Sequence, residues 1–145
     1  MKDFGIRITN LEVTEYSAFN PHQAVEKYEG RMRLSAQVSL NEKYKEIMVI
    51  IRLDIHIQPE NADSTELNIG MIETRTEFFL SDWNSFVKLE NEKLILDSAI
   101  DTFLVTIAYD STRGLLRERG KNDLIGKVIV PIVDPGEIRR NSIIN

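Results

Sequence analysis

Two neighbouring stretches in the middle of the chain alternate apolar side chains with other residues at a period of two. Apolar residues occupy every second position in residues 32–40 and again in residues 47–57. Alternation over this length places such side chains on one face of a β-strand. A tight reversal at Asn41-Glu42-Lys43 joins the two, so the pattern predicts a pair of antiparallel strands. The residues on the shared apolar face are Met32, Leu34, Ala36, Val38 and Leu40, followed by Ile47, Val49, Ile51, Leu53, Ile55 and Ile57.

The second of these strands is apolar on both faces at its start. Met48 and Ile50 fall on the face opposite Ile47. Strands that are buried on both sides, or that lie in an interface, have this composition. We therefore predict that Met48 and Ile50 contribute to an oligomer interface.

Two further strands each contain one change of phase. Residues 4–16 predict a strand whose alternation slips at Thr9-Asn10, which indicates a β-bulge. Residues 65–80 predict another strand, whose alternation slips at Gly70-Met71, where glycine permits the bend. A polar loop over residues 17–30 follows the first strand. The first half of the chain thus predicts four strands with no helix between them.

The second half predicts helices and an extended return. A linker over residues 81–93 precedes a long helix that begins near Asp97 or Ser98 and ends at Gly120. Residues 124–133 are extended, and Pro131 excludes them from the interior of a sheet. Residues 134–140 predict a short helix. The predicted class is α+β: a four-stranded antiparallel twisted sheet, a long helix, an extended proline-containing return and a short C-terminal helix, in a single domain over residues 1–145.

The long helix carries Ser111 and Gly114 in its second half. Glycine inside a helix costs about 1 kcal/mol relative to alanine, and close packing would compensate for this cost. We predict that Ser111 and Gly114 meet another helix, the sheet or a second subunit, and that they form part of an oligomer interface. A polar site that uses Ser111 and Arg113 is the alternative. The apolar face predicted from spacings of three and four comprises Leu96, Ile100, Phe103, Leu104, Ile107, Ala108, Ser111, Leu115 and Leu116.

The composition excludes several kinds of chemistry. Cysteine is absent, which removes disulfides, thiolate nucleophiles and cysteine-based zinc sites. His22 and His56 lie in no metal-binding motif, and the chain has neither a phosphate-binding glycine loop nor a nucleophile elbow. We predict no catalytic residue, no metal and no cofactor. Glu73 and Glu77 are interpreted as the solvated face of a strand, with a paired-carboxylate hydrolase as the alternative.

The charge and the apolar content bear on possible partners. A net charge of −5 argues against nucleic acid, whose recognition needs clustered cations. The one basic cluster is interpreted as a helix end, where cations suit the helix dipole. No apolar run approaches the length of about 20 residues that a membrane helix needs, and the N-terminus lacks the pattern of a signal peptide, so we expect a cytoplasmic protein with no membrane insertion. The basic cluster comprises Arg113, Arg117, Arg119 and Lys121.

The order of these elements resembles that of the SecB export-chaperone family. The local likeness lies in LIGKVIVPIVDPGEI, residues 124–138, where SecB-like proteins carry an apolar run, a proline and a transition into a helix. Residues 131–134 match that pattern in kind. The helix with Tyr109 and Arg113 stands where the family has its aromatic-rich main helix. The Leu-Phe-Pro-Tyr start and the Gly-Gly-Phe-Pro turn of the family are absent, which indicates a divergent member.

The resemblance implies a function in binding and no enzymatic activity. SecB-like proteins are ATP-independent holdases that serve protein export and transport, and they hold unfolded or precursor polypeptides in apolar grooves. The resemblance also implies a homo-oligomer, either a dimer or a tetramer. A holdase must keep apolar surface in contact with water. We therefore select four loop aromatics, Phe19, Tyr28, Trp83 and Phe86, as candidate polypeptide-binding residues, with core or hinge packing as the alternative.

Two other functions are compatible with the same fold. The protein could be an adaptor that binds one specific protein partner. It could instead bind a small molecule in a cavity under the helix, near Tyr109 and Arg113. Three measurements distinguish these functions. A holdase should suppress aggregation of a denatured client, an adaptor should retain one protein in a pull-down, and a small-molecule binder should carry a bound ligand after purification.

Overall fold

The computed structural model describes residues 5–22, 25–60, 65–128, 130–131, 133–134, 137–138 and 142–144. Its first half forms four long strands: β1 (Ile6–Ala18), β2 (Tyr28–Asn41), β3 (Glu46–Pro59) and β4 (Leu67–Leu80). Its second half contains the short helix α1 (Trp83–Phe86), the strands β5 (Val87–Glu90) and β6 (Lys93–Leu96), the long helix α2 (Ser98–Arg119), the 3-10 turn η1 (Leu124–Lys127) and the short strand β7 (Ser142–Ile144).

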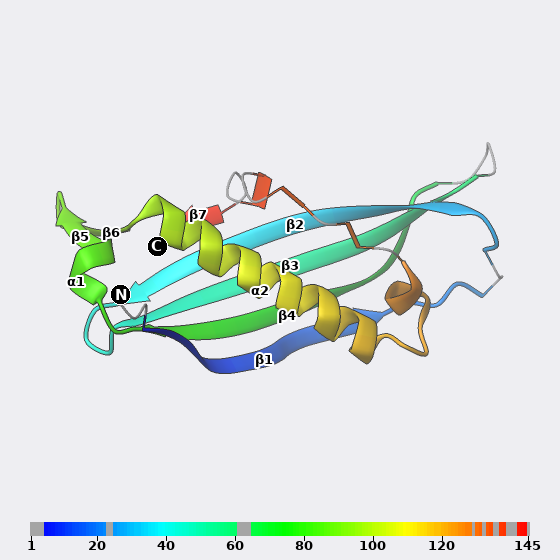
Figure 1. Ribbon diagram of the computed structural model, residues 1–145. Coiled ribbons are helices and arrows are strands. Elements are labelled where there is room, and N and C mark those ends of the chain that lie inside the picture. The colour runs from blue at the N-terminus through cyan, green and yellow to red at the C-terminus, as the bar shows by residue number, and fades with distance from the viewer. Residues whose placement is uncertain are drawn as a thin grey trace.

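The long strands form one antiparallel sheet. Their order across the sheet is β1, β4, β3 and β2, and β7 extends the sheet in parallel at the outer edge of β2. Figure 1 shows that α2 crosses one face of this sheet diagonally. Glu137 and Ile138 form a helical turn, in which both backbone N–H groups donate to the carbonyl of Asp134. The predicted α+β architecture is confirmed, and β7 is an element that the pattern did not predict.

Helix α2 begins and ends where the sequence predicts. The Asp97 carboxylate accepts hydrogen bonds from the backbone N–H groups of Ala99 at 3.1 Å and Ile100 at 3.2 Å. This contact satisfies donors that the first helical turn leaves unpaired. At the other end, the N–H of Gly120 donates to the carbonyl of Leu116.

The predicted linker over residues 81–93 is wrong, because most of it is regular. It contains α1, and it then continues into the hairpin of β5 and β6. The two strands are joined by Asn91 and Glu92, whose φ angles of 49° and 64° are both positive, as a type I′ turn requires. Glycine, asparagine and aspartate dominate such turns, so glutamate at the second position weakens the hairpin signal.

Both predicted β-bulges are present in the strand register. The pairing of β1 with β4 shifts between Ile8 and Asn10, so Thr9 is the extra residue. The pairing of β3 with β4 shifts beside Gly70, where Ile69 is the extra residue, one position earlier than predicted. Gly70 has a φ of 135°, which residues with a β-carbon rarely adopt.

The core lies between α2 and the sheet. Every second side chain of β3 from Ile47 to Ile57 is 0% exposed, as the alternation predicts. Met48 and Ile50 lie on the opposite face of β3 and are half-buried. Removal of this apolar surface from water stabilises the fold by about 25 cal/mol for each Å².

Helix α2 turns a different face to the sheet from the one predicted. Phe103 is 52% exposed, and Ile107 and Ser111 are only half-buried. Gly114 is exposed, and no described atom outside its own helix backbone lies within 4 Å of the place that a β-carbon would occupy. The prediction that another element of the chain packs against Gly114 is therefore wrong. The buried face comprises Asp101, Leu104, Val105, Ala108, Tyr109, Thr112 and Leu116.

A pair of buried hydroxyls links α2 to the sheet. Thr112 Oγ1 donates to the carbonyl of Ala108 at 2.7 Å and lies 2.6 Å from Thr74 Oγ1 on β4. Because the hydrogen of Thr112 is used by Ala108, the Thr74 hydroxyl is the donor between the two threonines. Both threonines are 0% exposed. The hydrogen bonds satisfy the two hydroxyls on a face whose burial comes mainly from Leu104, Tyr109 and Leu116.

We expect Thr112→Val to lower the free energy of unfolding by about 1–3 kcal/mol, because it leaves the buried Thr74 donor without an acceptor. The double variant Thr74→Val/Thr112→Val removes both hydroxyls and leaves neither donor unpaired, so most of that stability should return. We would measure urea unfolding of the wild type, both single variants and the double variant. The four values give the interaction energy between the two hydroxyls. A double variant less stable than Thr112→Val would contradict the assigned direction of the hydrogen bond.

We expect Gly114→Ala to raise the free energy of unfolding by about 0.5–1 kcal/mol, since alanine favours the helix and the added methyl group meets open space. Thermal unfolding, with native mass measured on the same samples, provides the test. If Ser111 and Gly114 form a close subunit interface, the same substitution should instead reduce both the assembly and the stability.

Candidate functional site

The chain after α2 returns across the helix side of the sheet. We call residues 128–134 the return segment; its described members are Val128, Val130, Pro131, Val133 and Asp134. The extended conformation predicted from residue 124 begins only at Val128, because residues 124–127 form η1.

Two side chains of α2 hold the return segment in place. The Tyr109 hydroxyl donates to the carbonyl of Pro131 at 2.7 Å, and Arg113 Nη2 donates to the carbonyl of Val130 at 3.1 Å. Burial raises the pKa of Tyr109 to about 12. Both contacts use backbone oxygens that no strand partner takes, so they stabilise an extended segment lying outside the sheet.

Hydrogen bonds to Asp123 connect the start of η1 to the end of β1. Asp123 accepts hydrogen bonds from the hydroxyl of Tyr16 at 2.8 Å and from Asn20 Nδ2 at 3.0 Å. These bonds lower the pKa of Asp123. Burial, followed by the bond to Asp123, raises the pKa of Tyr16 to about 12. Nearby, a β-carbon on Gly126 would overlap the carbonyl of Gly120, so glycine allows η1 to approach the end of α2.

The raised pKa values predict a loss of stability in alkali. A tyrosine with a pKa near 10 in the unfolded chain and about 12 in the folded protein contributes stability that is full below pH 10 and is lost as the pH rises to 12. We expect Tyr16→Phe/Tyr109→Phe to lose less stability between pH 10 and 12 than the wild type does, as measured by urea unfolding at each pH. An identical decline in both proteins would contradict the prediction.

A pocket that is lined mostly by apolar residues, which we call the apolar pocket, lies between the return segment and the sheet. Its cavity has a volume of about 310 Å³. Arg31 and Glu137 also line it, so its apolar walls carry charged groups of both signs. Ligand sites in proteins commonly combine an apolar lining with a few polar groups in this way. The apolar residues that line it are Met32, Leu34, Ile55, Val128, Val130, Pro131 and Val133.

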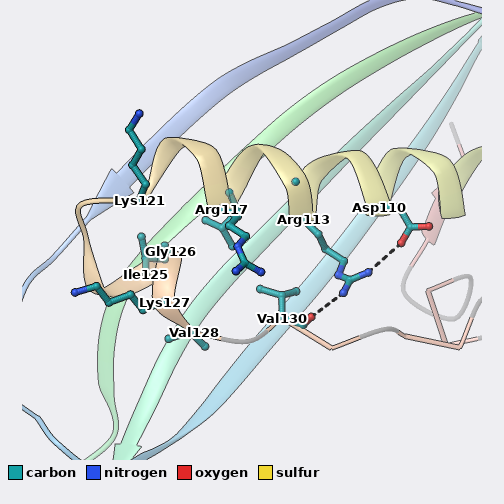
Figure 2. Close-up of a pocket in the computed structure, with 11 residues that line it drawn as sticks. Asp110, Arg113, Arg117, Lys121, Ile125, Gly126, Lys127, Val128 and Val130 are labelled. Atoms are coloured by element: carbon teal, nitrogen blue, oxygen red, sulfur yellow. Dashed lines mark hydrogen bonds and ion pairs between the residues drawn. The ribbon is translucent and has the colours of Figure 1, made fainter.

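A larger basic pocket lies on the other side of the return segment, against α2. Its cavity has a volume of about 660 Å³, and Val128 and Val130 line it as well as the apolar pocket. Figure 2 shows the guanidinium groups of Arg113 and Arg117 pointing from the helix towards the return segment. The other lining residues are Asp110, Gly114, Leu116, Lys121, Ile125, Gly126 and Lys127.

The structure does not bring the four predicted aromatic residues together. Phe19, which follows β1, is 55% exposed, and Tyr28, which begins β2, is half-buried. These two residues lie at opposite edges of the sheet, because β4 and β3 separate β1 from β2. Trp83 and Phe86 are at the other end of the sheet, after β4 (Figure 1). Trp83 is 3% exposed and belongs to the core, as the alternative interpretation expected, whereas Phe86 is half-buried.

The four predicted interface residues lie on two sides of the molecule. Met48 and Ile50 lie on the sheet face that points away from α2, whereas Ser111 and Gly114 lie on α2 itself. A cavity near Tyr109 and Arg113 was expected only for the small-molecule alternative, and Arg113 does line the basic pocket, whereas the apolar pocket was missed. The available signal was Pro131, which bars its apolar run from the interior of a sheet, so that this run could be expected to pack at an edge or over a face.

The described residues contain neither a candidate metal site nor a membrane-spanning helix. No group of three or more histidine, aspartate or glutamate side chains in this part of the chain could hold a metal ion. Over the same residues, no helix combines the length and the apolar character that are needed to cross a lipid bilayer.

Comparison with solved structures places this architecture in the SecB-like fold. The chain is similar to the SecB-like chaperone Rv1957 of Mycobacterium tuberculosis, solved in complex with a ChAD peptide from the Rv1956 HigA1 antitoxin. The TM-score is 0.65 at 13% sequence identity, and the likeness covers 89% of this chain and 90% of that one. No protein-family model matches the chain. No curated protein matches it either.

Proposed function

We propose that this protein is an ATP-independent holdase-type chaperone that binds unfolded or precursor polypeptide and catalyses no reaction. The observation that carries the proposal is the fold likeness, over 89% of the chain, to a SecB-like chaperone solved with a bound peptide. We further propose that it forms a homo-oligomer, a dimer or a tetramer, in the cytoplasm.

The apolar pocket supports this proposal. It lies between Met32 on β2 and Val133 on the return segment, and both residues are half-buried and therefore reachable from solvent by an apolar side chain of a client. The segment that forms one wall is tied to α2 by two hydrogen bonds and is not part of the sheet. An extended client peptide could place alternate side chains in such a pocket, as in other modes of peptide recognition.

A second candidate is an adaptor that binds one specific protein segment. The peptide seen in the similar structure comes from a single antitoxin, which favours a dedicated partner over a broad set of clients. The same pocket would serve either function. A pull-down distinguishes the two, because an adaptor should retain one stoichiometric protein, whereas a holdase should retain many.

The proposal is tested by suppression of client aggregation in the absence of ATP. We expect the wild type to suppress aggregation of a denatured client, and we expect Met32→Glu to need at least tenfold more protein, because it places a charge in the apolar pocket. Leu89→Glu, at a residue 68% exposed on the β5–β6 hairpin, is the matched control and should behave as the wild type.

Two further measurements complete this test. Circular dichroism and thermal unfolding establish that both glutamate variants are folded. The native mass is measured on the wild type at several concentrations. A wild type that suppresses no aggregation and elutes as a monomer would contradict the holdase proposal.

A further inference from the structure

The basic pocket concentrates positive charge in a protein whose net charge is −5. Arg113, Arg117 and Lys127 line it together with a single carboxylate, that of Asp110. Lys121 also lines the cavity, but Figure 2 shows its side chain pointing away from the return segment, and its Nζ lies 3.6 Å from Glu118. Figure 2 also shows the ammonium group of Lys127 pointing away from Arg113 and Arg117, so the two guanidinium groups are the cations that face the pocket, with Lys127 at its margin.

These cations are only partly neutralised. Within the described part of the chain, no carboxylate oxygen lies within 4.0 Å of the charged nitrogens of Arg117 or Lys127. Arg113 Nη1 lies 3.4 Å from Asp110, which is largely exposed, so this pair is weak. Arg113 Nε is buried and has no hydrogen-bond partner among the described residues. A buried N–H without an acceptor is costly, and a bound oxygen would remove that cost.

The helix dipole does not explain this arrangement. Cations stabilise a helix mainly from its last turn. Arg117 lies near the end of α2 at Arg119, but Arg113 lies more than a turn earlier, and Lys127 belongs to η1. Arg113 and Arg117 are four residues apart and so share one side of the helix.

The floor of the pocket is apolar, which argues against a site for a small inorganic anion. Leu116, Ile125, Val128 and Val130 also line it, and the last two also line the apolar pocket. A cavity of about 660 Å³ has the size of a site for a large ligand. The favoured ligand therefore carries carboxylates beside apolar groups.

We infer that the basic pocket binds acidic side chains of the client polypeptide, next to the apolar residues held in the apolar pocket. This inference rests on the proposed function and adds a preference among clients: segments in which glutamate or aspartate flanks apolar residues. Arginine recognises carboxylates through paired N–H donors, and complementary charge favours one partner over another.

The test uses two fluorescent peptides that have the same apolar centre, one flanked by glutamates and the other by glutamines. We expect the wild type to bind the glutamate peptide about tenfold more tightly in a fluorescence anisotropy titration, and we expect added salt to reduce this difference. In Arg117→Gln/Lys127→Gln the preference should vanish while the glutamine peptide still binds. Lys88→Gln/Lys93→Gln removes the same charge from the exposed β5–β6 hairpin and should keep the preference.

Each contrary outcome has a distinct meaning. Equal binding of both peptides by the wild type would overturn the inference and leave the proposed function standing. Failure to bind either peptide would contradict the proposed function as well. Competition by inorganic phosphate or by single-stranded DNA, at concentrations below those of the glutamate peptide, would overturn the assignment to acidic polypeptide and point to a phosphate ligand.

Discussion

Tyr109→Ala is expected to lower the free energy of unfolding by about 3–5 kcal/mol, as for other large aromatic side chains removed from a core. Tyr109 is 1% exposed and belongs to the core cluster beneath α2. Its hydroxyl also holds the carbonyl of Pro131 and lies 3.8 Å from the sulfur of Met32. The substitution therefore removes a core side chain and the support of the return segment together. Urea unfolding measures the loss.

Tyr109→Phe separates these two contributions. It keeps the ring and removes only the hydrogen bond to Pro131, so we expect a loss of about 1 kcal/mol. Because the return segment forms a wall of both pockets, we also expect Tyr109→Phe to weaken binding of the client peptides more than it weakens the fold. A Tyr109→Ala variant as stable as Tyr109→Phe would show that the aromatic ring contributes little to the core.

Gly70→Ala is expected to destabilise the protein by on the order of 3 kcal/mol. Gly70 has a φ of 135°, and a β-carbon there would collide with the carbonyl oxygen of Ser17 and crowd Ile125. The positive φ and the steric overlap both act at a buried position, where β4 packs between β1 and η1. The strand cannot relieve them without shifting the bulge at Ile69.

The matched control for Gly70→Ala is Gly114→Ala. Both add one methyl group, but Gly114 lies in an exposed helical position with open space around it. The two variants should change the midpoint of thermal unfolding in opposite directions. A stable Gly70→Ala variant with an unchanged register would contradict the role assigned to the positive φ.

The oligomer interface remains a prediction. Met48 and Ile50 lie on the sheet face that points away from α2. In a single chain their side chains are half-buried. Another subunit placed on that face would complete their burial. The native mass of Met48→Glu/Ile50→Glu, compared with that of the wild type, tests this assignment, and an unchanged mass would contradict it.

Local patterns along the sequence were sufficient for the four long strands and for both ends of α2, but not for β5, β6 and β7. Period-two alternation requires only that one face be buried, so Ile47 to Ile57 could be assigned to the core without knowledge of their partners. The slips at Thr9-Asn10 and Gly70-Met71 marked two bulges for the same reason, whereas the shift in β1 between Val13 and Glu15 was not predicted. Asp97 and Gly120 marked the ends of α2, because helix caps depend on contacts within a few residues.

The rotation of α2, the position of the return segment and the site were decided only by the tertiary structure. Apolar residues lie on more than one side of the helix, so their spacing did not single out the buried face, which combines five apolar residues with Asp101 and Thr112. The bond between Thr74 and Thr112, 38 residues apart in sequence, forms only once that face lies on the sheet. Likewise, Tyr109 and Arg113 find Pro131 and Val130 only after the chain has turned back across the sheet. Periodicity gave the buried side of the long strands, where every second residue is apolar. A pocket depends instead on which backbone and charged groups, distant in sequence, lie next to one another, and the packing of the whole fold determines this.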